Sequence, residues 1–192
     1  MTLAGIELVY LVKDIGEKTS GYYASNIWGI NRNSLLFKLH HPTKPDIMLM
    51  VSSIGMWITD KKIEPIEPNK MLRRLRSDLL RAKLTKIEQI GTERIAYFTF
   101  TNFEKEFTLI VEFFGDGNII LCNEERKILA LLHSIDVRHR QLRVGLEYAP
   151  PPEDGVDVLN LTKESFRELF STSGIGKTIG RGLGLPLSLI HI

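Results

Sequence analysis

The chain contains a single cysteine, and this scarcity limits both its covalent structure and its metal chemistry. Cys122 has no second thiol with which to form an intramolecular disulfide, and a zinc site built from several thiolates is excluded. A protein without disulfides fits a reducing compartment. Cys122 ends the apolar run 118–122, which is typical of a small buried residue and not of a reactive thiol.

Long hydrophobic runs are also missing. No stretch approaches the roughly 20 uninterrupted apolar residues that a membrane-spanning helix needs. The first residues carry no basic leader, and Glu7 interrupts the apolar stretch 6–12, so we expect no signal peptide. These absences predict a cytoplasmic protein with no membrane partner.

Motifs for catalysis and for cofactor binding are scarce as well. The Gly-Lys-Thr sequence at 176–178 resembles the end of a phosphate-binding loop, but Ser171 stands where that motif needs its first glycine. His40 and His41 would point to opposite faces of a strand and so could not share a metal ion. No Gly-x-Ser-x-Gly sequence marks a nucleophilic serine. We therefore expect no catalytic residue, no metal and no cofactor, and predict that the protein is not an enzyme.

The composition is that of a globular protein with a hydrophobic core. Of 192 residues, 43% are hydrophobic and 25% are charged, which suits one domain or one and a half. The formal net charge is only +2, from 25 Lys and Arg against 23 Asp and Glu. The total therefore decides little, and local clustering of basic residues matters more.

Hydrophobic periodicity predicts two blocks of strands separated by a helix. A first helix is expected over residues 3–15, broken by the segment 16–21, and a second over 69–84. Strands are expected at 25–30, 35–39, 47–51, 56–59, 94–101, 106–114, 118–122 and 128–134. Gly-Asp-Gly-Asn at 115–118 predicts a tight turn. The expected fold class is α+β, with a β-sandwich-like domain.

The C-terminal part has a different character. Residues 136–155 are expected to be irregular, and three prolines at 150–152 make a stiff spacer. Thr162 can cap a helix that runs to about residue 170. The sequence thus predicts a domain over 1–150, a proline-rich linker over 151–161 and a helical module over 162–192. We expect this module to be cut short, with residues 187–192 foreign to it.

Basic side chains cluster in two places. The second predicted helix carries six of them against one acidic residue: Lys70, Arg73, Arg74, Arg76, Arg81 and Lys83. Like charges three or four residues apart on a helix repel each other, so such an excess favours contact with phosphates or an acidic protein. A solvated face is the ordinary alternative. The loop arginines Arg138, Arg140 and Arg143 add guanidinium groups that suit phosphate oxygens and base stacking.

Several motifs in order along the chain resemble the NFACT family, formerly described as fibronectin-binding protein A-like. Near the start these are Glu-Leu at 7–8, Lys-Asp-Ile at 13–15, Gly-Tyr at 21–22 and Ser-Asn-Ile-Trp at 25–28. The basic helix at 71–84 and Ile-Gly-Thr-Glu-Arg-Ile at 90–95 follow. The strand pair at 109–113 and 117–121, then Gly145, Tyr148 and the prolines, complete the set. The likeness covers nearly the whole chain, and we expect an archaeal-type member.

The resemblance implies both a fold and a function. Family members are similar to the N-terminal domain of formamidopyrimidine-DNA glycosylases, followed by a helix-two-turn-helix module that would begin here near Thr162. The implied function is ribosome quality control. Such a factor binds a stalled large ribosomal subunit with its nascent chain–tRNA complex, and recruits aminoacyl-tRNA for untemplated tailing of the nascent chain. Relatives also carry a coiled coil and a further RNA-binding domain.

The resemblance also implies a tRNA-binding site. In the family, an acidic residue of the first helix and an Asp-Arg pair before the second strand block engage tRNA. Those positions fall on Glu7 and on Glu93 and Arg94. Both acidic positions hold Glu in place of Asp, which lengthens the side chain by one methylene. From the residues alone, Glu93 and Arg94 would be an ordinary surface pair.

Other functions fit parts of the sequence. A nucleic-acid-binding protein of glycosylase-like fold is one alternative, without glycosylase activity, because the N-terminal proline amine of those enzymes is replaced by Met-Thr-Leu. A fibronectin-binding adhesin, as the older family name suggests, would need a signal peptide or a wall anchor. A protein-interaction module with an acidic partner is a third alternative, and salt-sensitive binding to tRNA would distinguish it.

Overall fold

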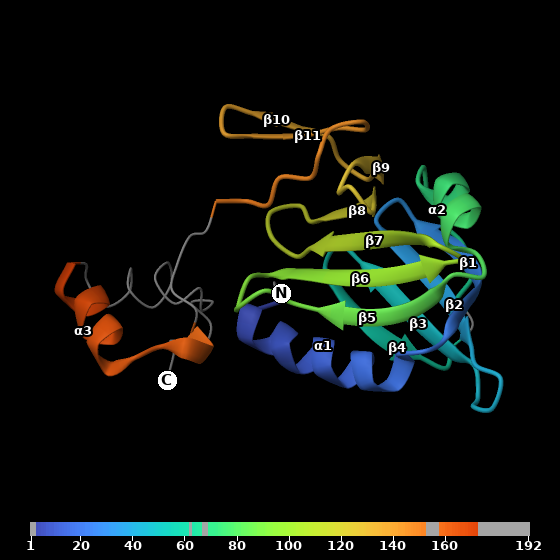
Figure 1. The fold of residues 1–192 in the computed structure, drawn as a ribbon, viewed down its shortest axis with the longest axis horizontal. Coiled ribbons are helices and arrows are strands. Elements are labelled where there is room, and N and C mark those ends of the chain that lie inside the picture. Colours follow the sequence, from blue (N-terminus) through green and yellow to red (C-terminus); the bar gives the residue numbers. More distant parts are fainter. Residues whose placement is uncertain (1–2, 62, 67–68, 153–157, 173–192) are drawn as a thin grey trace.

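The computed structural model describes residues 3–61, 63–66, 69–152 and 158–172, and its arrangement is shown in Figure 1. Helix α1 (Gly5–Thr19) comes first, and α2 (Leu72–Leu79) separates two runs of strands. The first run is β1 (Tyr23–Asn31), β2 (Ser34–His40), β3 (Ile47–Ser52) and β4 (Gly55–Thr59). The second run is β5 (Lys83–Glu88), β6 (Ile95–Asn102), β7 (Lys105–Glu112), β8 (Asn118–Asn123) and β9 (Ile128–Leu131). A short hairpin of β10 (Ile135–Val137) and β11 (Arg140–Leu142) precedes the 3-10 turn η1 (Val158–Asn160) and α3 (Lys163–Thr172).

Nine strands form one antiparallel sheet in the order β4-β3-β2-β1-β5-β6-β7-β8-β9. The sheet folds over on itself, because Phe37 of β2 stacks on Phe100 of β6 with ring centroids 6.0 Å apart. The turn at Gly117 also lies directly against Ser53, at the far end of the sheet. The prediction of an α+β domain with two strand blocks separated by a helix is confirmed, but the blocks form a single sheet and not the two sheets of a sandwich.

The two halves of the sheet are joined by a short contact between β1 and β5. Tyr23 pairs with Lys83 there, and backbone hydrogen bonds of 2.7–2.9 Å extend the contact, for example from Leu84 to Tyr22 and from Ala24 to Ala82. So short a junction lets the two halves rotate against each other and face one common core. Helix α1 packs against β4, β5 and β6, and α2 against β1, β6 and β9, so the helices cover the two openings.

Helix α1 runs one turn further than predicted. Its buried stripe includes Leu8, Val12 and Ile15 and ends at Thr19, whose hydroxyl donates to the carbonyl of Ile15 at 2.7 Å. Gly16 therefore does not end the helix. The break comes at Gly21, where φ is +88°, a conformation that glycine adopts without steric cost.

The second predicted helix, over 69–84, is only half as long. It ends at Leu79, Arg81 takes a positive φ of 67°, and residues from Lys83 onward form β5 instead. The pairing of this segment with β6 overrides its helical pattern, as tertiary contacts often do. Lys83 therefore lies on a strand and not on the basic helix.

The segment after β9, expected to be irregular, contains the β10–β11 hairpin. Leu142 and Tyr148 pack on the outer face of the second strand run and form a small second core with Ile110 and Ile120. Cys122 belongs to this core and is buried as predicted, and desolvation raises the pKa of its thiol to about 12.

Helix α3 begins as predicted, because the Thr162 hydroxyl accepts a hydrogen bond from the Ser165 amide at 3.1 Å. The Gly-Lys-Thr sequence at 176–178 and the rest of the predicted module lie outside the described residues. The helix-two-turn-helix module, the three-part domain division and the likeness to glycosylases stay predictions. Within the described residues, no helix is both long enough and apolar enough to cross a membrane.

Candidate nucleic-acid interface

The first turn of α1 meets the loop that joins β5 to β6. Gly5 lies so close to this loop that an added Cβ would stand 1.8 Å from the carbonyl oxygen of Thr92. The side-chain amide of Gln89 then joins the two segments, donating to the carbonyls of Gly5 at 2.9 Å and of Glu93 at 2.5 Å. Segments 84 residues apart in sequence are thereby fastened together. We call this region, residues 4–7 and 89–94, the polar corner.

The three predicted tRNA-binding residues all belong to the polar corner. Glu7 is exposed, while Glu93 and Arg94 are partly exposed. A carboxylate oxygen of Glu7 accepts a hydrogen bond from the Ala4 amide at 2.7 Å and so caps α1. The backbone of Arg94 is fixed because its carbonyl accepts from the Phe113 amide at 2.8 Å. The guanidinium of Arg94 makes no hydrogen bond or ion pair with any described residue.

The replacement of Asp by Glu at position 7 has a structural use. A glutamate three residues after the N-cap can reach back to the N-cap amide, which is the geometry seen between Glu7 and Ala4. The carboxylate also lies at the positive end of the α1 dipole, which stabilises its charge. The longer side chain therefore suits the helix start.

Gln89 was not among the residues expected at the site. Its amide nitrogen joins the corner, and its Oε1 is buried with no hydrogen-bond partner among the described residues. A buried acceptor without a partner costs about 1–3 kcal/mol. Nothing in the sequence marks this glutamine, because its role depends on the packing of α1 against a distant loop.

Most of the predicted basic residues lie elsewhere, on and beside α2. Lys70, Arg73, Arg81 and Lys83 are exposed. Arg74 is exposed and pairs with Asp78 through Nε and Oδ2 at 2.6 Å. Arg76 is half-buried, and its Nε donates to the Ile27 carbonyl at 2.8 Å. We call this set the basic edge.

The polar corner and the basic edge lie at opposite ends of β5 and β6 (Figure 1). The corner adjoins the start of β6, whereas Asn102 at its end donates to the Asp78 carbonyl of α2. Eight residues of strand separate the two regions, which corresponds to about 25 Å. The predicted site residues thus form two regions and not one.

The third group of arginines, around the β10–β11 hairpin, is divided. Arg138 and Arg143 are exposed. Arg140 is not, since only 7% of its side chain is exposed and its guanidinium pairs with Glu112. The prediction that Arg140 contacts RNA is therefore wrong. Side chains along a strand point alternately to its two faces. On β11, Arg140 and Leu142 face the sheet and are buried, whereas Gln141 between them is exposed.

Glu112, Arg140 and Tyr148 form a buried polar network that sequence reasoning missed. The Tyr148 hydroxyl donates to Glu112 Oε1 at 2.8 Å, and Arg140 Nε donates to the Ala149 carbonyl at 2.8 Å. Burial, and then the charge of Glu112, raise the pKa of the Tyr148 hydroxyl far above its usual range. The one signal in the sequence is a lone carboxylate inside the apolar run 109–113. This network fastens the hairpin to the sheet.

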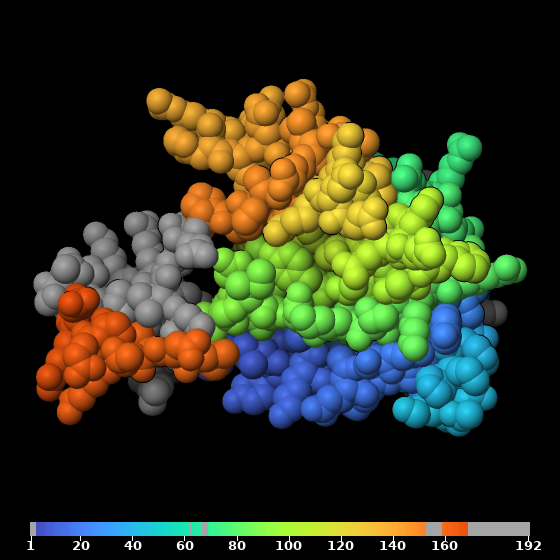
Figure 2. Space-filling view, in the orientation of Figure 1, coloured from blue at the N-terminus to red at the C-terminus, as the bar shows by residue number. Residues whose placement is uncertain are grey.

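Figure 2 shows where the hairpin and the two helices lie on the surface. The hairpin, in orange, and α2, in green, rise along the same edge of the molecule, with β8 and β9, in yellow, between them. Helix α1, in blue, occupies the opposite edge. Arg138, in the turn between β10 and β11, and Arg143, directly after β11, therefore lie outside the polar corner.

A single folded antiparallel sheet with two covering helices defines the class of domain. Residues 5–184 match the family described as NFACT N-terminal and middle domains, and the chain belongs to this family. The resemblance drawn from the sequence motifs is confirmed.

Two curated relatives illustrate the likeness. Ribosome quality control complex subunit 2 of Saccharomyces cerevisiae is 32% identical over 133 residues, which cover 67% of this chain and 12% of the relative. The archaeal Rqc2 homolog aRqcH of Methanocaldococcus jannaschii is 33% identical over 141 residues, which cover 71% of this chain and 21% of the relative. The chain therefore spans a small part of these relatives. Because the two identities are nearly equal, the archaeal-type assignment stays a prediction.

Solved structures show the same fold. The N-terminal domain of the fibronectin-binding protein PavA from Streptococcus pneumoniae aligns with a TM-score of 0.83 and 22% identity, covering 96% of this chain and 76% of that one. The N-terminal part of the fibronectin/fibrinogen-binding protein from Streptococcus suis aligns with the same TM-score at 23% identity. Because the sequence identities are this low, the likeness to these two proteins establishes the fold and nothing about function.

Proposed function

We propose that the chain acts in ribosome quality control, as part of a factor that binds a stalled large ribosomal subunit with its nascent chain–tRNA complex. In this proposal it recruits aminoacyl-tRNA for untemplated tailing of the nascent chain, and acts by binding without catalysing a reaction. The names of the yeast and archaeal relatives support the ribosomal setting. Work next to ribosomes agrees with the cytoplasmic location expected from the sequence.

The observation that carries the proposal is the construction of the polar corner. Gln89 and Gly5 bring the start of α1 against the 89–94 loop, so that the exposed Glu7 and the partly exposed Arg94 belong to one small region. A guanidinium with no partner among the residues that the structure describes can bind phosphate oxygens with two parallel hydrogen bonds or stack on a base. Carboxylates can accept hydrogen bonds from base amino groups or from a ribose 2′-hydroxyl. Together these groups suit tRNA.

The basic edge supplies the second part of the proposal. Exposed lysines and arginines contact phosphates without reading sequence. We assign this edge, with Arg138 and Arg143, to backbone contacts with RNA of the large subunit or with tRNA. Arg140 is excluded from this assignment because its guanidinium is buried and pairs with Glu112. A fibronectin-binding role gains no support, because the likeness to the streptococcal proteins establishes fold alone.

Arg94→Ala tests the proposal. We expect the variant to associate with isolated large subunits as the native chain does, because the basic edge is intact. Retention of aminoacyl-tRNA on those subunits should fall at least tenfold, since a hydrogen bond to a charged group contributes about 1.5–3 kcal/mol. Co-sedimentation with labelled tRNA measures both quantities.

Arg143→Ala is the matched control, because it removes an exposed guanidinium outside the polar corner. It should lower tRNA retention much less than Arg94→Ala. Native tRNA retention in the Arg94 variant would refute the assignment of the corner.

A further inference from the structure

A nearly fully exposed phenylalanine stands at the turn between β6 and β7. Phe103 is 96% exposed, whereas Phe100 and Phe107 on the adjoining strands are buried. Its backbone has a φ of +54°. Turns with positive φ select Gly, Asn or Asp, because a residue with a larger side chain is strained there. Neither burial nor turn chemistry therefore explains a phenyl ring at this position.

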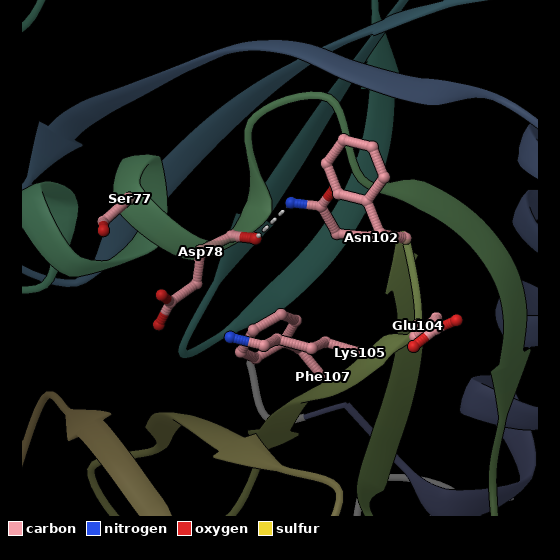
Figure 3. Close-up of a pocket in the computed structure, with 7 residues that line it drawn as sticks. Ser77, Asp78, Asn102, Glu104, Lys105 and Phe107 are labelled. Carbon is pink, nitrogen blue, oxygen red and sulfur yellow. Dashed lines mark hydrogen bonds between the residues drawn. The ribbon is translucent and has the colours of Figure 1, made fainter.

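An open hollow of about 530 Å³ lies beside this turn, between it and the C-terminal half of α2. Figure 3 shows the polar groups that surround it. The Asn102 amide donates to the Asp78 carbonyl at 3.4 Å, Lys105 reaches back toward Asp78, and Glu104 points away. A space of this size can hold a planar ring with hydrogen-bonding edges. Donors and acceptors are both present around it.

Helix α2, which carries Asp78 of the lining, is strongly basic. Arg73 and Arg74 are exposed on the same helix, and Arg74 pairs with Asp78. The charged residues of the lining itself are Asp78, Glu104 and Lys105, and Glu104 points away. Asp78 is the only acidic residue in the range 69–84, against six basic ones. A ligand that carries negative charge next to a planar group would meet complementary surfaces at both points.

We propose that this hollow, with Phe103 at its rim, binds one unpaired base of an RNA, while the arginines of α2 hold the adjoining phosphates. The inference rests on the RNA-binding part of the proposed function and specifies its chemistry, a single-stranded segment. Unpaired bases stack on exposed aromatic rings, and every base has a face for this purpose, whereas a duplex hides those faces.

The lining of the hollow favours RNA over a protein partner. Only Phe103 and Phe107 among its lining residues are apolar. An amphipathic helix needs a row of apolar contacts three or four residues apart, and an extended peptide needs an unpaired strand edge. The hollow offers neither, because β6 and β7 are paired with each other along their full length.

Phe103→Asn separates binding from folding. Asparagine accepts positive φ, so the variant should be at least as stable as the native chain in urea unfolding. Its affinity for a fluorescein-labelled single-stranded oligouridine should fall about tenfold, as expected for the loss of one stacked base. Binding of an RNA duplex of equal length should not change, because phosphate contacts are retained. Fluorescence anisotropy on the full chain measures the affinities for the oligouridine and for the duplex.

Phe103→Trp provides a positive control with a direct signal. The variant should bind the oligouridine at least as tightly as the native chain, and stacking should quench the emission of the new tryptophan. The native tryptophans, Trp28 and Trp57, lie on the outer face of the first strand run and should not respond. Native affinity in Phe103→Asn, or displacement of the RNA by an equal amount of poly-glutamate, would overturn the inference.

These measurements use oligonucleotides alone and leave the polar corner intact. A chain that fails to retain tRNA on large subunits can still show quenching of the Phe103→Trp variant. Conversely, a chain that retains tRNA through Arg94 can lack any response at Phe103. The two proposals therefore fail separately.

Discussion

Gly5 and Gly16 lie in the same helix but tolerate a methyl group very differently. A Cβ at Gly5 would stand 1.8 Å from the backbone oxygen of Thr92, whereas one at Gly16 would stand 3.8 Å from the Ile87 Cβ, an ordinary contact. Gly5→Ala should therefore lower the free energy of unfolding by about 2–3 kcal/mol. Gly16→Ala should raise it by about 0.5–1 kcal/mol, because alanine loses less entropy in a helix. Urea unfolding monitored by circular dichroism measures both.

The same pair tests the polar corner. Gly5→Ala must push α1 away from the 89–94 loop and should weaken tRNA retention along with stability. Gly16→Ala leaves the corner untouched and should bind as the native chain does. Equal stability in the two variants would show that the close approach of Gly5 to Thr92 is not a feature of the folded protein in solution.

At the scale of secondary-structure elements, sequence reasoning succeeded where one local pattern dominates. The β1–β4 and β6–β9 strands, the turn near Gly115 and the cap at Thr162 follow from alternation and turn chemistry. It failed for 80–84, the expected end of the second helix, because β5 begins at Lys83 and pairs with β6. It also failed for 135–142, whose strands depend on a buried ion pair with Glu112. In both segments a contact distant in sequence decides the conformation.

The same limit applies to the candidate site. The family motifs indicated Glu7, Glu93 and Arg94, but not Gln89, which holds their segments together. The clustering of basic residues indicated Arg140 as an RNA contact. Its position on β11, and not its residue type, decides that its side chain is buried. The direction of each side chain is fixed only when the sheet forms.

The β10–β11 hairpin depends on the buried pair of Arg140 and Glu112. Arg140→Met leaves a buried carboxylate without its cation, and we expect the free energy of unfolding to fall by about 3–5 kcal/mol. Adding Glu112→Leu to that variant should recover much of the loss, because no buried charge is then left unpaired. Hydrogen exchange of residues 135–142 and urea unfolding measure these effects.

Arg138→Met is the control for the hairpin. Its side chain is exposed, so stability should change by no more than about 0.5 kcal/mol. Affinity for RNA should fall instead. A hairpin that exchanges equally fast in the Arg138 and Arg140 variants would argue against the anchoring role of Glu112.

At the scale of the whole molecule, folding one sheet over on itself sets the two candidate regions apart. The polar corner forms where α1 covers one opening, and the basic edge forms where α2 covers the other. Recognition by a few specific groups and attraction by many charges can then act on different parts of one large RNA. A net charge of +2 conceals this division, because it sums the basic and acidic residues of the whole chain.

A charge-reversal experiment tests that division. Lys70 and Arg73 are exposed on the basic edge, and neither is tied to a partner as Arg74 is to Asp78. The double variant Lys70→Glu, Arg73→Glu should weaken binding to every RNA tested. It should also reduce the slope of log K against log salt concentration by about 1.5–2, because two phosphate contacts are lost. Arg94→Ala should change this slope by less than about one.

Lys44→Glu with Lys61→Glu makes the decisive control, because it changes the net charge equally at exposed positions outside the basic edge. If attraction by net charge alone drove binding, both double variants would lose the same affinity. Local phosphate contacts predict a loss in the Lys70 and Arg73 variant that the Lys44 and Lys61 variant does not share. Salt titrations of tRNA binding, carried out on variants of equal stability, distinguish attraction by net charge from local phosphate contacts. Only the loss of local contacts lowers the slope of log K against log salt concentration in one double variant and not in the other.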